Sequence, residues 1–371
     1  MKKRSILTLF SLGLLLTSCS PSKTYNVNDY RTSMNFHDDF KILQLTDLHF
    51  GIETNIQKQL DFISSSIQKE DPDLIILTGD NFMYSSKKLV RTLISNLNEN
   101  CKTLTQSHPD RITKFAITYG NHDNQGDYPR YYINDVVSKY STNVNKEIEE
   151  SKYAAFIDYE DDELNGLTNY FIDLVDDVNK DETTVDVKYR IHVIDSNTYH
   201  FTGIKYGYDV IHEDQLEHAK NIYETSTKDK DYIGLGVFHI PLEEFQEGKN
   251  QYEDSSSNNG QGIFLENVLY PYTNNDSYKK LKEANISAFI VGHNHKINSD
   301  VIYNESSDNI DDKAIFSFGV KSTDQLYHSQ DLIGYKTIIL KDNMTKEEFI
   351  SIDYINENFT NVTNRYQDYE K

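Results

Sequence analysis

The stretch FAITYGNHD, residues 115–123, ends an apolar-rich run with an amide, an imidazole and a carboxylate. Residues 115–118 are typical of a buried β-strand. Asn121, His122 and Asp123 would then lie in the turn that leaves this strand, either as an ordinary polar turn or as one half of a site for metal ions. The rest of the chain decides between these two interpretations.

Short apolar runs alternate with helical patterns on the N-terminal side of this stretch. Residues 40–45 and 74–77 have the composition of buried strands, and residues 56–67 and 87–97 repeat apolar side chains at helical spacing. This alternation is typical of βαβ units, in which helices connect parallel strands. We therefore expect an α/β domain that begins near residue 39.

The C-terminal part of the chain continues with strands and contains one more polar region. Strands are expected at residues 189–195, 233–238 and 286–291, with a helix that carries Ile211, Leu216 and Ile222 on one face. Antiparallel strands that close a second sheet are expected at residues 314–318, 335–340 and 349–352. Residues 124–188 are rich in Asp, Glu, Asn and Tyr, with strand-like pieces at 153–159 and 170–175, and we interpret them as an insertion or lid.

Composition and charge exclude several classes of protein. Of the 371 residues, 37% are hydrophobic and 12% aromatic, which is enough to bury a core and excludes a disordered chain. The 37 basic and 59 acidic residues give a formal net charge of -22. Because such a charge repels phosphate backbones, we expect no stable nucleic-acid binding, and a phosphorylated substrate would need local cations.

The N-terminus has the features of a secretory leader. Three basic residues at positions 2–4 precede the apolar residues 6–16, which are too few to span a membrane, and two small residues precede Cys19. This pattern resembles the lipobox of a bacterial lipoprotein. The resemblance implies that residues 1–18 are removed, that Cys19 is lipidated and anchored in the bacterial cell membrane facing outside the cytoplasm, and that residues 19–38 form a flexible tether. An ordinary secretory peptide is the alternative.

Polar clusters follow five of the expected strands. They are TDLH with Asp47 and His49, TGDN with Asp80, YGNHD with Asn121, FHIP with His239, and VGHNH with His293 and His295. If the strands lie side by side, all five clusters emerge at one edge of the sheet, where open α/β folds place their ligand sites. Each cluster alone would more often be a turn or a helix cap, but seven such placements together favour a site.

The residue types in these clusters are metal ligands of the hard-to-borderline kind, namely carboxylate, amide and imidazole without thiolate. Two overlapping sets are possible: Asp47, His49, Asp80 and His295 around one ion, and Asp80, Asn121, His239 and His293 around a second. Two divalent ions about 3.5–4 Å apart can hold the attacking and leaving oxygens of a displacement at phosphorus and lower the pKa of a bound water.

In this order the five motifs resemble those of the calcineurin-like metallophosphoesterases, which run DxH, GDxx, GNH[DE], a lone His after a strand, and GHxH. The resemblance covers roughly residues 40–320. It implies a four-layer α/β/β/α sandwich of two mixed sheets between outer helices, and the seven ligand roles given above, for two divalent ions that are Mn, Fe or Zn. It also implies that His122 is a non-ligand imidazole beside the substrate. Its imidazolium would stabilise the leaving oxygen or donate a proton to it, and its partner Asp123 or another carboxylate would raise its pKa.

A closer similarity is to the bacterial and fungal relatives of purple acid phosphatase that carry TGDN and FHIPL, with a helix such as HEDQLEH between them. His49 stands where the purple enzymes have a non-ligand glycine, and Met83 stands where they have an iron-binding tyrosine. We therefore expect a colourless Mn, Zn or Fe(II) site.

These observations predict a membrane-anchored, extracytoplasmic phosphoesterase domain over residues 39–356, followed by a polar tail at 357–371. It would hydrolyse a small phosphate ester by means of a metal-bound hydroxide, with no protein partner implied. Phosphodiesterase or nuclease specificity is the alternative among enzymes. A non-catalytic surface lipoprotein and a metal-scavenging surface protein are the alternatives outside them.

Overall fold

The computed structural model describes residues 23–51, 55–141, 152–159, 161, 163–180, 185–201, 203–226, 231–254, 258–305 and 309–366. The expected leader and Cys19 lie outside these residues. Within them, no helix is long and apolar enough to cross a membrane.

A mixed, eight-stranded sheet forms one half of the fold. In spatial order its strands are β1 (Arg31–Asn35), β5 (Tyr170–Val175), β6 (Val187–Val193), β9 (Ile233–Val237), β11 (Ile286–Val291), β13 (Lys313–Phe318), β12 (Ile297–Asn304) and β10 (Gly260–Phe264). The central strands β6, β9, β11 and β13 run parallel to one another. At one edge β12 is antiparallel to β13, and β10 is antiparallel to β12.

A mixed, five-stranded sheet forms the other half. Its spatial order is β15 (Phe359–Thr363), β14 (Gly334–Leu340), β2 (Phe40–Leu45), β3 (Leu74–Thr78) and β4 (Lys114–Thr118). Strands β2, β3 and β4 are parallel, so their carboxyl ends share one edge.

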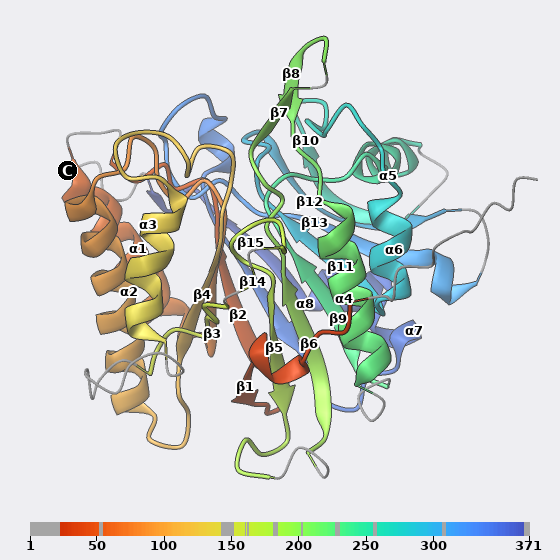
Figure 1. Ribbon diagram of the computed structural model, residues 1–371, viewed down its shortest axis with the longest axis horizontal. Coiled ribbons are helices and arrows are strands. Elements are labelled where there is room, and N and C mark those ends of the chain that lie inside the picture. The colour runs from red at the N-terminus through yellow and green to blue at the C-terminus, as the bar shows by residue number, and fades with distance from the viewer. Residues whose placement is uncertain are drawn as a thin grey trace, which may run out of the picture.

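Helices cover the outer faces of both sheets (Figure 1). On one flank lie α1 (Ile56–Glu70), α2 (Lys87–Ser107) and α3 (Arg130–Val137), and on the other lie α4 (Glu213–Thr225), α5 (Glu244–Glu253) and α6 (Ser277–Glu283). Two short helices, α7 (Lys346–Phe349) and α8 (Ile352–Asn358), connect β14 to β15.

Helix α2 illustrates how the sequence directs this arrangement. The Ser86 side chain caps its first turn by accepting a hydrogen bond from the Leu89 amide. The apolar face then continues through Cys101 and Leu104, both buried, so the helix runs to Ser107, ten residues beyond the expected end.

The main core lies between the two sheets. Leu43, Ile75 and Ile117 of the smaller sheet and Ile191 and Leu235 of the larger sheet are fully buried in one cluster. The predicted four-layer α/β/β/α sandwich is therefore confirmed.

Hydrogen bonds also join the sheets where the parallel strands end. The Gln44 side chain donates to the carbonyl of Val291 at 3.1 Å, and the Thr118 hydroxyl donates to the carbonyl of Ile194 at 2.9 Å. The loops that leave the strands of both sheets consequently meet at one end of the sandwich.

The predicted tether at residues 19–38 is wrong over its described part. Residues 31–35 form β1, which pairs in parallel with β5, and Tyr25 and Tyr30 are buried against α4. The folded part therefore begins well before residue 39, because aromatic residues in an otherwise polar segment supply enough apolar surface to pack.

The predicted polar tail at residues 357–371 is also wrong over its described part, residues 357–366. Residues 359–363 form the edge strand β15, and Tyr366 is fully buried. The strand expected at 349–352 is instead the junction of α7 and α8, where Ser351 accepts a hydrogen bond from the amide of Tyr354 as a helix cap.

Two further predictions about strands need correction. The expected insertion or lid at residues 124–188 includes β5, which is an integral strand of the larger sheet, while residues 153–159 contribute two isolated bridges, from Ala154 to Phe115 and to Ser141. Residues 313–318 belong to the larger sheet and not to the second one. Sequence periodicity identifies strands but carries no information on which sheet they join.

Candidate metal centre

Side chains from both sheets converge where the parallel strands end. The first three motifs follow the smaller sheet, with Asp47 and His49 after β2, Asp80 after β3 and Asn121 after β4. The other two follow the larger sheet, with His239 after β9 and His293 and His295 after β11. All seven are at most 5% exposed.

The first cluster consists of Asp47, His49, Asp80 and His295, with one ligand atom of each within 4.8 Å of the others. The Nε2 atoms of His49 and His295 are 3.2 Å apart, and His295 Nε2 is 3.1 Å from Asp47 Oδ1. These are the four residues that the sequence assigns to one ion.

The second cluster consists of Asp80, His239 and His293, at the same mutual limit of 4.8 Å. His239 Nε2 lies 3.2 Å from Asp80 Oδ2 and 3.3 Å from His293 Nδ1. Asp80 belongs to both clusters, so its carboxylate is placed to bridge two ions.

Asn121, which the sequence assigns to the second ion, has a buried side-chain oxygen that is available as a ligand. Its Nδ2 donates a 2.7 Å hydrogen bond to the Tyr199 hydroxyl, which leaves Oδ1 buried and without a hydrogen-bond partner among the described residues. An orphaned buried acceptor is costly unless a ligand satisfies it.

The donor set fits divalent ions. Imidazole nitrogens face each other at 3.2 and 3.3 Å beside carboxylate oxygens, and the Asn121 oxygen is unsatisfied. Carboxylate, amide and imidazole ligands without thiolate suit Mn, Fe or Zn. The six charged or imidazole residues could therefore hold two metal ions.

Hydrogen bonds behind the ligands fix their orientation. His239 Nδ1 lies 2.9 Å from the carbonyl of Thr78, and His295 Nδ1 lies 2.8 Å from the carbonyl of Tyr327. A carbonyl can only accept, so each Nδ1 carries a proton and only Nε2 can serve as a ligand.

The shared carboxylate dominates the electrostatics. Burial lowers the pKa of His239, but the adjacent Asp80 outweighs it and raises that pKa to about 9. Burial, reinforced by the positive charge on His239, lowers the pKa of His293 to about 3. The negative charge of Asp80 thus favours cations at this centre.

The backbone is strained at four of the ligands. Asp47, His49, Asp80 and His293 have φ between 44° and 74°, the left-handed region. Each such conformation costs about 1–3 kcal/mol and persists where the surrounding structure enforces it, commonly at functional sites.

Gly120 shows why the motifs require their glycine residues. A Cβ at this position would lie 2.3 Å from Asp80 Oδ1 and 2.4 Å from Asp80 N. Only glycine lets the strand exit pass this close to the shared carboxylate.

His122 lies beside the ligands without joining them. Its side chain is 22% exposed, its Nε2 is 4.0 Å from Asp80 Oδ2, and its ring stands edge-on to that of His49 at 5.2 Å between centroids. The His122 amide donates a 2.7 Å hydrogen bond to Asp80 Oδ1.

The predicted pairing of Asp123 with His122 is wrong. The buried carboxylate of Asp123 accepts hydrogen bonds from the amides of Phe82 at 2.7 Å and Gly120 at 2.8 Å, and from the Asn81 side chain at 3.1 Å. Asp123 therefore joins the loops that carry Asp80 and Asn121, because its short side chain turns back toward backbone donors.

The sequence analysis did not predict that the segment after β13 hydrogen-bonds to the backbone of the first motif. Lys321 is buried, and its Nζ donates a 3.0 Å hydrogen bond to the carbonyl of Asp47, while the Ser322 hydroxyl accepts one from the amide of Thr46 at 3.0 Å. No sequence signal marks Lys321 and Ser322, since each resembles an ordinary loop residue.

A hairpin forms a wall of the site. Strands β7 (Tyr199–Phe201) and β8 (Tyr206–Tyr208) form a small separate sheet that projects from the sandwich in Figure 1. Tyr199 contacts Asn121, and the Tyr208 ring stands edge-on to His293 at 4.4 Å between centroids.

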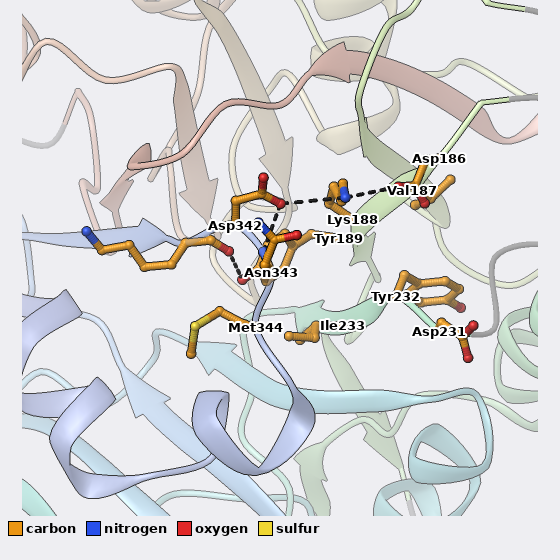
Figure 2. A pocket seen from close by; sticks show the side chains of 11 residues that line it. Asp186, Val187, Lys188, Tyr189, Asp231, Tyr232, Ile233, Asp342, Asn343 and Met344 are labelled. Atoms are coloured by element: carbon orange, nitrogen blue, oxygen red, sulfur yellow. Dashed lines mark hydrogen bonds and ion pairs between the residues drawn. The ribbon is translucent and has the colours of Figure 1, made fainter.

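Another pocket, of about 220 Å³, lies at the opposite end of the larger sheet (Figure 2). Val187 and Ile233, at the starts of β6 and β9, line it, whereas His239 follows the other end of β9. Its Lys188 is paired with Asp186 at 2.9 Å and lies 3.6 Å from Asp342, so the pocket takes no part in the metal centre.

Comparisons with known proteins agree with this geometry. Residues 40–297 match the family model described as calcineurin-like phosphoesterase. Phosphatase DCR2 of Saccharomyces cerevisiae is 24% identical over 271 residues, which are 69% of this chain but only 44% of the yeast protein. Probable inactive purple acid phosphatase 29 of Arabidopsis thaliana is 27% identical over 316 residues, 77% of this chain and 75% of that protein.

Solved structures with a similar chain path are more distant. GAP50, titled the anchor in the inner membrane complex of Plasmodium, has a TM-score of 0.45 at 15% identity, covering 88% of this chain and 89% of its own. A dimetal phosphatase from Danio rerio has a TM-score of 0.43 at 10% identity, covering 82% and 94%. Since the family model spans more than half of the chain, this protein belongs to the calcineurin-like phosphoesterase family.

Proposed function

We propose that this protein hydrolyses phosphate esters at a binuclear metal centre. One observation carries the proposal: two clusters of ligand atoms, each within 4.8 Å, share the carboxylate of Asp80. Two ions held there would clamp the oxygens of an in-line displacement and supply hydroxide at neutral pH.

The residues of the chain would bind and orient these ions and exclude competing ligands. Asp80 supplies the shared negative charge, and its Oδ1 is held by the amide of His122. Because all the ligands are buried, their charges act in a low-dielectric environment and are stronger than in water.

We propose that His122 acts on the substrate. It is more exposed than the ligands, and its Nδ1 has no hydrogen-bond partner among the described residues. An imidazolium there would donate a proton to the leaving oxygen, a contribution that is typically about 10²–10⁴-fold in rate.

The ion type is proposed from the ligands present. Position 83 is a methionine, so the chain lacks the tyrosine that the purple enzymes use to bind iron. Colourless Mn, Zn or Fe(II) is the proposed occupant, in keeping with a donor set of carboxylate, amide and imidazole.

Two other functions are alternatives to the proposed hydrolysis of phosphate esters. A diesterase or nuclease would use the same centre, since the motifs address only the phosphoryl group. A non-catalytic binding protein is suggested by the word inactive in the names of two relatives, purple acid phosphatases 29 and 14 of Arabidopsis thaliana. The retention of all seven ligand residues in this chain argues against it.

We also propose that Cys19 carries lipid and holds the protein on the outer side of the bacterial cell membrane. The basic residues 2–4, the apolar run 6–16 and the small residues before Cys19 support this proposal. Metabolic labelling with an alkyne fatty acid should mark the wild-type chain and not Cys19→Ala. Equal labelling of both would contradict it.

The function is tested with chelator-stripped protein, residues 20–371, refilled with Mn, Zn, Fe or Ni and given mono- and bis-nitrophenyl phosphate. We expect metal-dependent turnover that Asp80→Ala abolishes, with the preferred ester separating monoesterase from diesterase. Bound metal is counted in parallel. Two ions per chain without turnover of any ester would favour the binding protein.

A further inference from the structure

A pocket of about 470 Å³ is lined by Tyr208, whose ring contacts His293 of the second metal cluster. Its lining is mainly apolar and aromatic, and it consists of Tyr208, Gln246, Asn267, Val268, Leu269, Tyr270 and Tyr272. No acidic side chain lines it, although the chain as a whole carries a formal charge of -22.

Tyr208 connects this pocket to the metal centre. Its ring stands edge-on to the ligand His293, with 4.4 Å between centroids, and also lines the pocket. The Tyr208 ring also stacks on the ring of Tyr199, with 5.7 Å between centroids and an interplanar angle of 28°. A substrate held at His293 would therefore have the pocket within reach of its organic part.

Asn294 fixes the pocket wall relative to the metal ligands. It lies between His293 and His295, is 1% exposed, and donates to the carbonyl of Asn267 at 3.1 Å. Its Oδ1 accepts a 3.2 Å hydrogen bond from the amide of Leu269. The loop that carries the pocket is thus hydrogen-bonded to the same motif that supplies two ligands.

The outer wall of the pocket is an exposed aromatic ring held in place. Tyr272 is 63% exposed, and its ring packs on Gly207, where a Cβ would approach it to 2.4 Å. Lys205 Nζ lies 3.3 Å from the centre of the Tyr272 ring, a cation–π contact that adds a positive charge near the pocket. Large apolar surface left exposed in a hydrophilic protein commonly marks a binding site.

We infer that this pocket binds a flat aromatic group of the substrate, so that the preferred esters join phosphate to an aryl group or a nucleobase through a short linker. The inference rests on the proposed function, since the phosphate is the part held at the metals. Tyr208 and Tyr272 supply aromatic surface, Leu269 supplies an apolar wall, and aromatic rings stack on such surfaces with little dependence on sequence or substituent.

The test compares esters whose leaving groups are chemically alike. Benzyl phosphate and propyl phosphate both release a primary alcohol, and their methyl diesters serve if the protein is a diesterase. Alcohol release by the metal-loaded full chain gives kcat/KM for each ester. We expect the benzyl ester to be preferred about tenfold, which is the size of one aromatic stacking contact.

Variants assign the preference to the pocket. In Tyr272→Ala the benzyl-to-propyl ratio should fall close to one, and Tyr272 is exposed enough for the fold to tolerate the change. Tyr131, on α3 and 53% exposed, does not line the pocket, so Tyr131→Ala should keep the wild-type ratio. A wild-type ratio near one, or a ratio unchanged in Tyr272→Ala, would overturn the inference while the proposed function stands.

Failure of the proposed function gives a different result. If no ester is turned over with any metal, binding of benzylphosphonate and propylphosphonate to the metal-loaded protein is measured by calorimetry. Tighter binding of benzylphosphonate that is lost in Tyr272→Ala would support the pocket, and equal binding of the two would exclude it.

Discussion

The side-chain amide of Asn121 donates a 2.7 Å hydrogen bond to the hydroxyl of Tyr199, 78 residues further along the chain. An amide can present either its oxygen or its nitrogen to a metal, and only the oxygen is a ligand. By binding the nitrogen, Tyr199 leaves Oδ1 buried, without a hydrogen-bond partner among the described residues, and available as a ligand.

Removal of the Tyr199 hydroxyl should therefore weaken the second metal position. In Tyr199→Phe the affinity for the second Mn ion should fall about 10- to 100-fold, because partners behind a ligand typically contribute that much. Calorimetric titration resolves the two ions. Tyr206→Phe, on the same hairpin but 75% exposed, should titrate like the wild type. Unchanged affinity in Tyr199→Phe would contradict the orienting role.

Replacement of His122 should slow chemistry without loss of metal. In His122→Asn we expect two ions per chain and a kcat for alkyl esters lowered about 10²–10⁴-fold, since these leaving groups need a proton. Nitrophenyl esters, whose leaving group is stable as an anion, should lose much less. Equal losses for both ester types would exclude proton donation by His122.

Replacement of Asp123 should lower the stability of the fold and should leave the pH profile of kcat unchanged. In Asp123→Asn one carboxylate oxygen becomes an NH2 group, so the side chain can accept from the amide of Phe82 or of Gly120 but not from both, which should cost about 1–3 kcal/mol of unfolding free energy. Urea denaturation of the metal-free protein measures this. Asp127→Asn, at an exposed position of the same loop, should be neutral. If the pH profile of kcat shifts in Asp123→Asn, that result would support the predicted pairing of Asp123 with His122.

His218 should make stability fall with acid. Burial lowers its pKa to about 4, and its ring packs edge-on to Tyr25 at 4.6 Å and Tyr30 at 4.3 Å. Because the unfolded chain, with an imidazole pKa near 6.5, binds the proton more tightly, this residue costs stability as the pH falls through 6.5, until the loss levels off near 4.

The pH dependence should therefore be smaller in His218→Phe. Between pH 7 and pH 5 the wild type should lose about 2 kcal/mol more unfolding free energy than this variant, as measured by urea denaturation. The control variant is His200→Phe, which replaces an exposed histidine of the β7–β8 hairpin. If the unfolding free energy depends on pH in the same way in the wild type and in His218→Phe, His218 does not cause the loss of stability in acid.

The strands and the ligand clusters could be predicted because both depend on local sequence. Residues 40–45 and 286–291 form strands with the predicted bounds, since short and mostly apolar runs have few other ways to be buried. Asp47 and His295 come together because they follow parallel strands of two facing sheets. The segments at 31–35 and 359–363 escaped prediction, since edge strands mix polar and apolar residues.

The sequence by itself determined which side chains meet at the metal centre, because the order of strands and their exits is written in short motifs. Only the tertiary structure decided what supports them. Lys321 reaches the carbonyl of Asp47 across 274 residues, and Tyr199 reaches Asn121 across 78. Contacts of such separation depend on how two sheets and a hairpin pack, and no local pattern of residue types records that packing.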